Sequence, residues 1–221
     1  MPDLLLVRHG QASFGAADYD VLSDTGWDQA RALGRALARL GEAPASVWIG
    51  AQRRHRETLE GILDGLGQTA SPQVHPGFNE FDFTGLLNAR FAGRARPENL
   101  HSDRKTHFRA LRETVLEWQR GQIADPPETY AGFSARVRAA RQAAVAGATG
   151  PVLVVSSGGA IGQSVAEVMG APADAMIRLQ LQIRNCAVAR IFVTPQAEHL
   201  VSFNEVPFLD AANMNHLLTY S

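Results

Sequence analysis

The chain has 221 residues, of which 45% are hydrophobic and 19% are charged, a composition typical of globular proteins. The formal net charge of −1 argues against a general role in binding nucleic acids or membrane surfaces. Cys186 is the one cysteine, which excludes an internal disulfide and a multi-cysteine zinc site and favours a reducing cytoplasm. The apolar run at the N-terminus has four residues, too few for a signal peptide or a membrane span.

Three short apolar runs predict buried strands. They cover Leu4–Val7, Val47–Ile49 and Val152–Val155, and none alternates with polar residues. Runs of this kind are typical of strands in a parallel sheet that is covered on both faces.

Helical patterns lie between these strands. The first begins after Ser23, a good N-cap, and stops at Gly41. The second begins near Ala51 and runs to Gly65, and a third follows the segment 156–159. Alternating strands and helices predict right-handed crossovers and a three-layer domain.

The segment 86–146 differs from the rest because it shows no clear strand pattern and contains two apolar stripes of helical spacing. One stripe runs from Phe108 to Trp118 and another from Phe133 to Ala144, with Asp125-Pro126-Pro127 between them. We expect a helical insertion near one edge of the sheet. It either roofs an active site or forms a plain packing layer.

The end of the chain predicts an antiparallel hairpin. Ala187–Thr194 and Leu200–Phe203 have the composition of strands, and Pro195-Gln196 between them indicates a turn. The expected fold is therefore α/β: a three-layer sandwich in one domain, residues 1–221, with a mostly parallel sheet, an antiparallel edge hairpin and the helical insertion.

Polar residues follow the three predicted parallel strands, where ligands bind in open α/β sheets. Arg8-His9-Gly10 follows the first strand, Arg53-Arg54-His55-Arg56 follows the second, and Ser156-Ser157-Gly158-Gly159 opens a helix. Arginine binds phosphate through a planar fork of donors, histidine is a nucleophile or base, and helix N-termini bind anions. Gly10 permits a sharp turn or a close approach to a ligand. Together these segments predict a phosphate site.

The first of these segments, Leu6-Val7-Arg8-His9-Gly10, resembles the signature of the histidine phosphatase superfamily, which includes the cofactor-dependent phosphoglycerate mutases. The resemblance extends over most of the chain. It includes Arg54 with Thr58 four residues later, Phe78-Asn79-Glu80, and the strand and loop from Val152 to Gly159.

The resemblance implies specific roles. His9 would accept the phosphoryl group on nitrogen, while Arg8 and Arg54 would clamp its oxygens and stabilise the charge of the transition state. Glu80 would give a proton to the leaving alkoxide and later help to activate water; Asp82 is the rival acid nearby. No metal ion or other cofactor is required for this chemistry.

The chain also departs from the family pattern. Ser157 stands where the family has a second histidine, and Gly50-Ala51 stands where Ser-Pro is common. We expect Ser157 and Gly158 to contact phosphate, although Ser157 could instead cap the helix. Losing the histidine should cost about 2–4 kcal/mol of transition-state stabilisation, unless another cationic residue compensates. The candidates are Arg53, His55, Arg56 and Arg184.

The predicted function is a phosphomonoester phosphatase that acts through a phosphohistidine on His9. Its partner would be a small phosphorylated substrate, with no nucleic acid and no membrane. Two alternatives stay open: phosphoryl transfer of the mutase type, and a weakly active or inactive protein that binds a phosphorylated ligand. The sequence leaves the substrate and the oligomeric state undetermined, with a homo-oligomer as one option.

Overall fold

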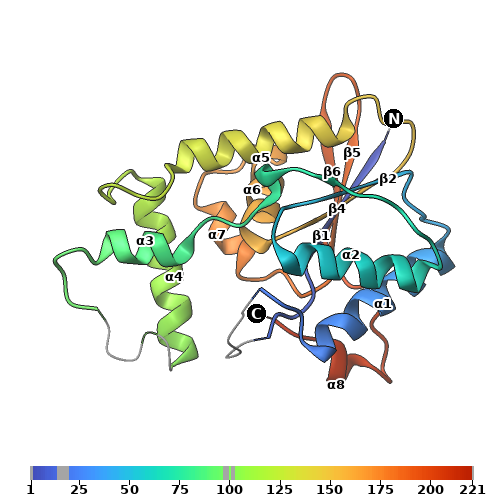
Figure 1. Ribbon diagram of the computed structural model, residues 1–221. Helices are drawn as coiled ribbons and strands as arrows, with labels where there is room; N and C mark the ends of the chain where they lie inside the picture. The colour runs from blue at the N-terminus through green and yellow to red at the C-terminus, as the bar shows by residue number, and fades with distance from the viewer. Residues whose placement is uncertain (1, 14–19, 97–99, 101–102, 221) are drawn as a thin grey trace.

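A computed structural model describes residues 2–13, 20–96, 100 and 103–220 (Figure 1). It contains a six-stranded sheet of order β3-β2-β4-β1-β5-β6. The strands are β1 (Asp3–Arg8), β2 (Ser46–Ile49), β3 (Gln73–Val74), β4 (Val152–Ser156), β5 (Val188–Val193) and β6 (Glu198–Glu205). The pairs β1–β4, β2–β4 and β2–β3 are parallel, whereas β1–β5 and β5–β6 are antiparallel. The predicted fold class is therefore confirmed.

Helices cover both faces of this sheet (Figure 1). They are α1 (Asp24–Leu40), α2 (Arg53–Leu66), α3 (Phe83–Arg90), α4 (Arg104–Gln119), α5 (Tyr130–Val145), α6 (Gly158–Val168), α7 (Ala175–Gln180) and α8 (Met214–Leu217), with a 3-10 helix η1 (Pro76–Phe78). Helices α1 and α2 pack on one face, and α5 and α6 pack on the other.

The apolar run of β1 contributes side chains to the cores on both faces of the sheet, because successive side chains of a strand point in opposite directions. Leu5 and Val7 join the core under α1 and α2. Leu4 and Leu6 join the core under α5 and α6. All four side chains are buried, which explains why this strand shows no polar alternation.

Helices α1 and α2 approach each other closely through two glycines. An ideal Cβ on Gly34 would lie 2.1 Å from the carbonyl oxygen of Ile62, and one on Gly65 would lie 2.2 Å from that of Arg31. The sequence pattern predicted that α2 stops at Gly65, but the helix continues to Leu66 and ends at Gly67, which has a φ of 66°. A glycine needed for packing and one needed for a helix end look alike in a sequence.

The segment 86–146 contains most of α3 and all of α4 and α5, and its residues 97–99 and 101–102 lie outside the described ones. Helices α3 and α4 stand away from the sheet (Figure 1). Trp118 of α4 and Phe133 of α5 share a buried cluster with Met176 of α7. Ala140 and Ala144 of α5 instead join the core of the sheet, so only part of the two apolar stripes packs away from the sheet.

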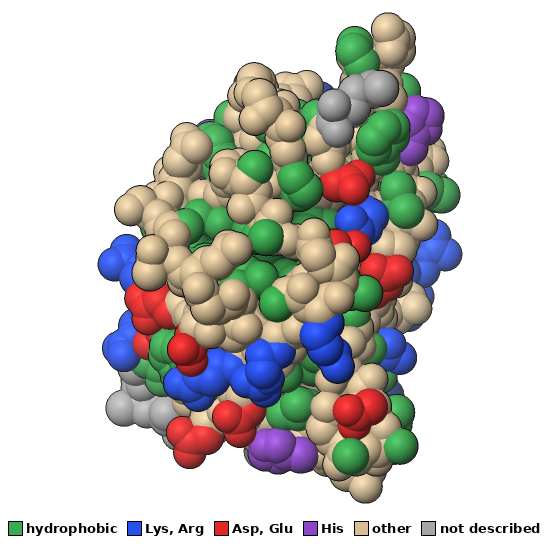
Figure 2. Space-filling model, turned by 90° about the vertical axis from the view of Figure 1, so that its right-hand side faces the viewer, with side chains coloured by type: hydrophobic (Ala, Val, Ile, Leu, Met, Phe, Trp, Pro, Cys, Tyr) green, Lys and Arg blue, Asp and Glu red, His purple; other side chains and the backbone are tan. Residues whose placement is uncertain are grey.

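Figure 2 shows Lys and Arg side chains interspersed with Asp and Glu side chains on one face of the molecule. This distribution agrees with a formal net charge of −1. Among the helices of the described ranges, none is both long enough and apolar enough to cross a lipid bilayer.

The contact between α1 and α2 generates a stability prediction. We expect Gly65→Ala to lower the free energy of unfolding by about 1–3 kcal/mol, because the new methyl group meets the backbone of α1. This loss should appear even though alanine favours helices more than glycine does. Urea unfolding measures the change, and Glu60→Ala, on the exposed side of α2, is the control. A Gly65→Ala variant as stable as the wild type would contradict the packing described.

Candidate active site

The pairing of β1 with β4 assembles the site. Arg8 lies opposite Ser156 in the parallel register, and the backbone N–H of His9 donates to the carbonyl of Ser156 over 2.9 Å. On the other side of β4, Gly50 N–H donates to the carbonyl of Val155 over 3.2 Å. The three loops predicted to carry phosphate chemistry therefore leave the sheet at the same edge.

His9 is held in a form suited to nucleophilic attack. Its side chain is buried, and its Nδ1 lies 2.8 Å from the carbonyl oxygen of Gly10. Because a carbonyl only accepts, Nδ1 carries the hydrogen, and Nε2 of the neutral ring keeps a lone pair. Burial, followed by the charges of Arg54 and Arg8, holds the pKa of His9 well below its usual range. The ring is therefore neutral at physiological pH.

Gly10 is required for a close contact between two backbones. An ideal Cβ on Gly10 would lie 2.6 Å from the carbonyl oxygen of Gly26 in α1. Gly10 N–H donates to Thr58 Oγ1 over 3.0 Å, and that hydroxyl donates to the carbonyl of Arg54 over 2.7 Å. Thr58 thus connects the His9 loop to the turn of α2 that bears Arg54.

Arg8 and Arg54 are both buried and fixed by neighbouring groups. Arg8 Nη1 donates to the carbonyl of Ile183. Arg54 Nη1 forms an ion pair with Asp20 Oδ1 at 2.8 Å, and its Nη2 lies 3.4 Å from Ser157 Oγ. The two guanidinium groups provide the positive charge that a phosphoryl group requires.

Glu80 is held by the start of α6. One carboxylate oxygen accepts from Gly159 N–H over 2.9 Å, and the other accepts from Phe81 N–H over 3.2 Å. An ideal Cβ on Gly159 would lie 2.1 Å from Glu80 Oε1, so only glycine permits this contact. Burial raises the pKa of the Glu80 carboxyl above its usual range, which favours a protonated acid. The rival acid Asp82 is exposed and caps α3, accepting from Gly85 N–H over 2.8 Å.

Ser157 occupies the N-cap position of α6, but its side chain makes no capping hydrogen bond. The capping alternative was therefore wrong. Its Oγ instead lies 2.8 Å from Nε2 of His55 and 3.4 Å from Oε1 of Gln52. Gly158 lies beside Arg8, because an ideal Cβ on it would be 3.7 Å from Arg8 Nε. Contact of Ser157 and Gly158 with phosphate stays a prediction.

The four residues that were candidates to compensate for the missing histidine have different surroundings in the structure. Arg53 pairs with Glu57 at 2.7 Å, and Arg184 Nε donates to the Tyr220 hydroxyl over 3.2 Å. Arg56 is exposed. Of the four, His55 is the one that contacts Ser157.

Sequence reasoning missed Asp20 and Gln52. Gln52 Oε1 accepts from the backbone N–H of Glu80 over 3.0 Å, and Asp20 pairs with Arg54. Neither residue stands in a recognisable motif, and each contacts a partner that is distant in sequence. Among the described residues, no three His, Cys, Asp or Glu side chains are grouped so as to hold a metal ion.

Comparisons with known proteins agree with this geometry. Residues 4–206 match the model of the histidine phosphatase superfamily, branch 1. A 2,3-bisphosphoglycerate-dependent phosphoglycerate mutase from Maricaulis maris is 31% identical over 58% of this chain, although the alignment spans only 50% of that relative. A protein named probable phosphoglycerate mutase GpmB, from Erwinia tasmaniensis, is 29% identical over 86% of this chain and 85% of its own length.

The fold is also similar to that of YhfR from Bacillus stearothermophilus, with a TM-score of 0.70 and 19% identity over 95% of this chain and all of that one. The family match covers nearly the whole sheet and every segment that forms the site. This chain belongs to branch 1 of the histidine phosphatase superfamily.

Proposed function

We propose that this protein is a phosphomonoester phosphatase that forms a phosphohistidine on His9. One observation carries the proposal. The buried neutral imidazole of His9 is oriented by its Nδ1 contact with Gly10 and lies in the field of Arg8 and Arg54. This arrangement supplies a nucleophilic nitrogen together with the positive charge that a phosphoryl group needs.

The reaction has two steps. In the first, Nε2 of His9 attacks phosphorus while the bond from phosphorus to the leaving oxygen breaks, and Glu80 gives its proton to that oxygen. In the second, the Glu80 carboxylate takes a proton from water as the water attacks phosphorus and the bond to His9 breaks. Inorganic phosphate leaves, and both residues return to their starting forms. Arg8 and Arg54 stabilise the charge on the phosphoryl oxygens in both steps.

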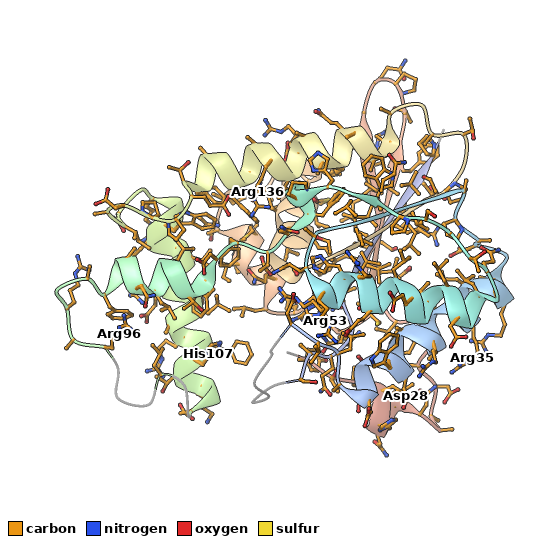
Figure 3. All side chains as sticks on the ribbon, in the orientation of Figure 1. Asp28, Arg35, Arg53, Arg96, His107 and Arg136 are labelled. Atoms are coloured by element: carbon orange, nitrogen blue, oxygen red, sulfur yellow. The ribbon has the colours of Figure 1, made fainter. Side chains whose placement is uncertain are left out.

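The ion pairs that two further arginines, Arg136 and Arg53, form with carboxylates support hydrolysis over a mutase reaction. A mutase must retain an intermediate with two phosphoryl groups, which calls for further cations. Arg136 of α5 (Figure 3) instead binds both oxygens of Glu128, at 2.7 and 2.8 Å, and the carbonyl of Asn79 at 2.9 Å. Arg53, at the start of α2, pairs with Glu57. The names of the two sequence relatives nevertheless make a phosphoglycerate mutase the second candidate.

We further propose a small phosphorylated compound as the substrate, without a nucleic acid or a membrane as partner. Charges of both signs are interspersed on the surface in Figure 2, which supports this choice. The single cysteine, Cys186, supports a reducing compartment such as the cytoplasm.

Trapping the phosphoenzyme tests the nucleophile. After brief incubation with a radiolabelled phosphomonoester and an alkaline quench, the wild type should carry label that is stable to base and labile to acid. His9→Ala should carry none, and it should lose hydrolysis of p-nitrophenyl phosphate. The matched control is His199→Ala, because His199 is an exposed residue of β6. Isomerisation of 3-phosphoglycerate faster than its hydrolysis would favour the mutase, and phosphate binding with no label on His9 would favour a binding protein.

The pH dependence of kcat/KM tests whether Glu80 is the acid. Catalysis needs neutral His9, whose pKa is lowered from 6.5, and protonated Glu80, whose pKa is raised from 4.5. The rising limb of kcat/KM should therefore lie below 6.5 and the falling limb above 4.5. Glu80→Gln should abolish the falling limb and lower kcat/KM for alkyl phosphates by about 10²–10⁴-fold.

The loss of kcat/KM in Glu80→Gln should be much smaller with p-nitrophenyl phosphate, because p-nitrophenolate leaves without a proton and kcat/KM does not include hydrolysis of the phosphoenzyme. Asp82→Asn, which retains a capping side chain, should behave like the wild type. An equal loss of kcat/KM on both substrates, or a falling limb that persists in Glu80→Gln, would exclude Glu80 as the proton donor.

A further inference from the structure

A second imidazole lies beside the nucleophile. His55 of α2 is completely buried, and its ring centroid is 6.0 Å from that of His9. Its Nε2 lies 2.8 Å from Ser157 Oγ. The chemistry assigned to His9, Glu80 and the two arginines does not use this residue.

The backbone is shaped to accommodate the ring. An ideal Cβ on Gly50 would lie 2.4 Å from Nδ1 of His55, so any other residue at position 50 would displace the imidazole. Gly50 and Ser157 are also two of the positions at which the chain departs from the family pattern. The structure shows that both departures meet at His55, one making room for the ring and the other contacting it.

His55 does not supply a positive charge to the site. Burial and the charge of Arg54 lower its pKa to about 3. The neutral ring offers one N–H donor and one lone pair, so its contribution is a directed hydrogen bond.

The donor and acceptor roles in that bond depend on the tautomer of His55 and on the other partners of Ser157. Arg54 Nη2, at 3.4 Å, can only donate to the hydroxyl, and Gln52 Oε1, at 3.4 Å, can only accept from it. The hydroxyl has one hydrogen. If that hydrogen points to Gln52 or to a phosphoryl oxygen, Nε2 of His55 must be the donor to Ser157 Oγ.

We propose that His55 is a positioning residue for phosphoryl transfer: its Nε2–H donates to Ser157 Oγ and directs the Ser157 hydroxyl hydrogen to a phosphoryl oxygen of the substrate. When the hydrogen turns from Gln52 to the substrate, Gln52 Oε1 keeps its bond from Glu80 N–H. The imidazole thus acts on the phosphoryl group through a serine. This inference rests on the proposed phosphatase function.

A double-mutant cycle with a conservative replacement tests the inference. Ser157→Ala and His55→Leu should each lower kcat by about 100-fold, the scale of a lost oxyanion donor. The double variant should be no slower than either single variant, since the two residues act as one unit. His55→Gln, which retains an N–H donor, should recover most of the activity, whereas the pair His199→Gln and His199→Leu should match the wild type.

Additive losses in the double variant, or His55→Gln as slow as His55→Leu, would overturn the proposal. A rise in KM with kcat unchanged would also overturn it, because the two residues would then contribute to substrate binding and not specifically to the transition state. Urea unfolding of each variant separates these losses from unfolding.

Nitrogen-15 NMR of histidine in the wild-type protein tests the direction of the bond without any substitution. With orthovanadate bound, Nε2 of His55 should show the chemical shift of a protonated ring nitrogen. An unprotonated Nε2 would show that Ser157 donates to His55, and the inference would fail.

Different results would refute the proposed phosphatase function and the proposed role of His55. Absence of a phosphoenzyme on His9 in active wild-type protein would refute the proposed function. A normal phosphoenzyme, together with independent effects of His55 and Ser157, would refute only the role of His55.

Discussion

The parallel pairing of β1 with β4 is the constraint on which the site depends. The register that places Arg8 opposite Ser156 also places His9 beside the loop that begins α6. A slip of one residue would turn the side chains of β1 to the opposite faces of the sheet. Burial of Leu4 and Leu6 on one face and of Leu5 and Val7 on the other therefore fixes the position of His9.

Backbone groups then orient the side chains of His9 and Glu80. The Gly10 carbonyl selects the tautomer of His9, and the Gly159 N–H holds the carboxylate of Glu80. One donor at the N-terminus of α6 is therefore used to place the acid. Both contacts need glycine, because a Cβ at position 10 would meet Gly26 and one at position 159 would meet Glu80.

Burial sets the protonation states that the proposed reaction needs. Removal from water disfavours the charged form of any group. For His9 this lowers the pKa and leaves a neutral nucleophile, and for Glu80 it raises the pKa and favours a protonated acid. A single physical cause thus sets the protonation states of both the proposed nucleophile and the proposed acid. It also keeps His55 neutral, which limits that residue to hydrogen bonding.

The sequence by itself determined the fold class and the positions of the long elements, because apolar runs and helical periods are local signals. It missed β3, a strand of two exposed residues with no such signal. Arg8, His9, Arg54 and Glu80 could be named because each stands in a contiguous motif. Only the tertiary structure showed that Gly50, His55 and Ser157 form one group. Ser157 lies 102 residues from His55 in the chain, and the interaction that joins them exists only when β2, α2 and β4 pack together.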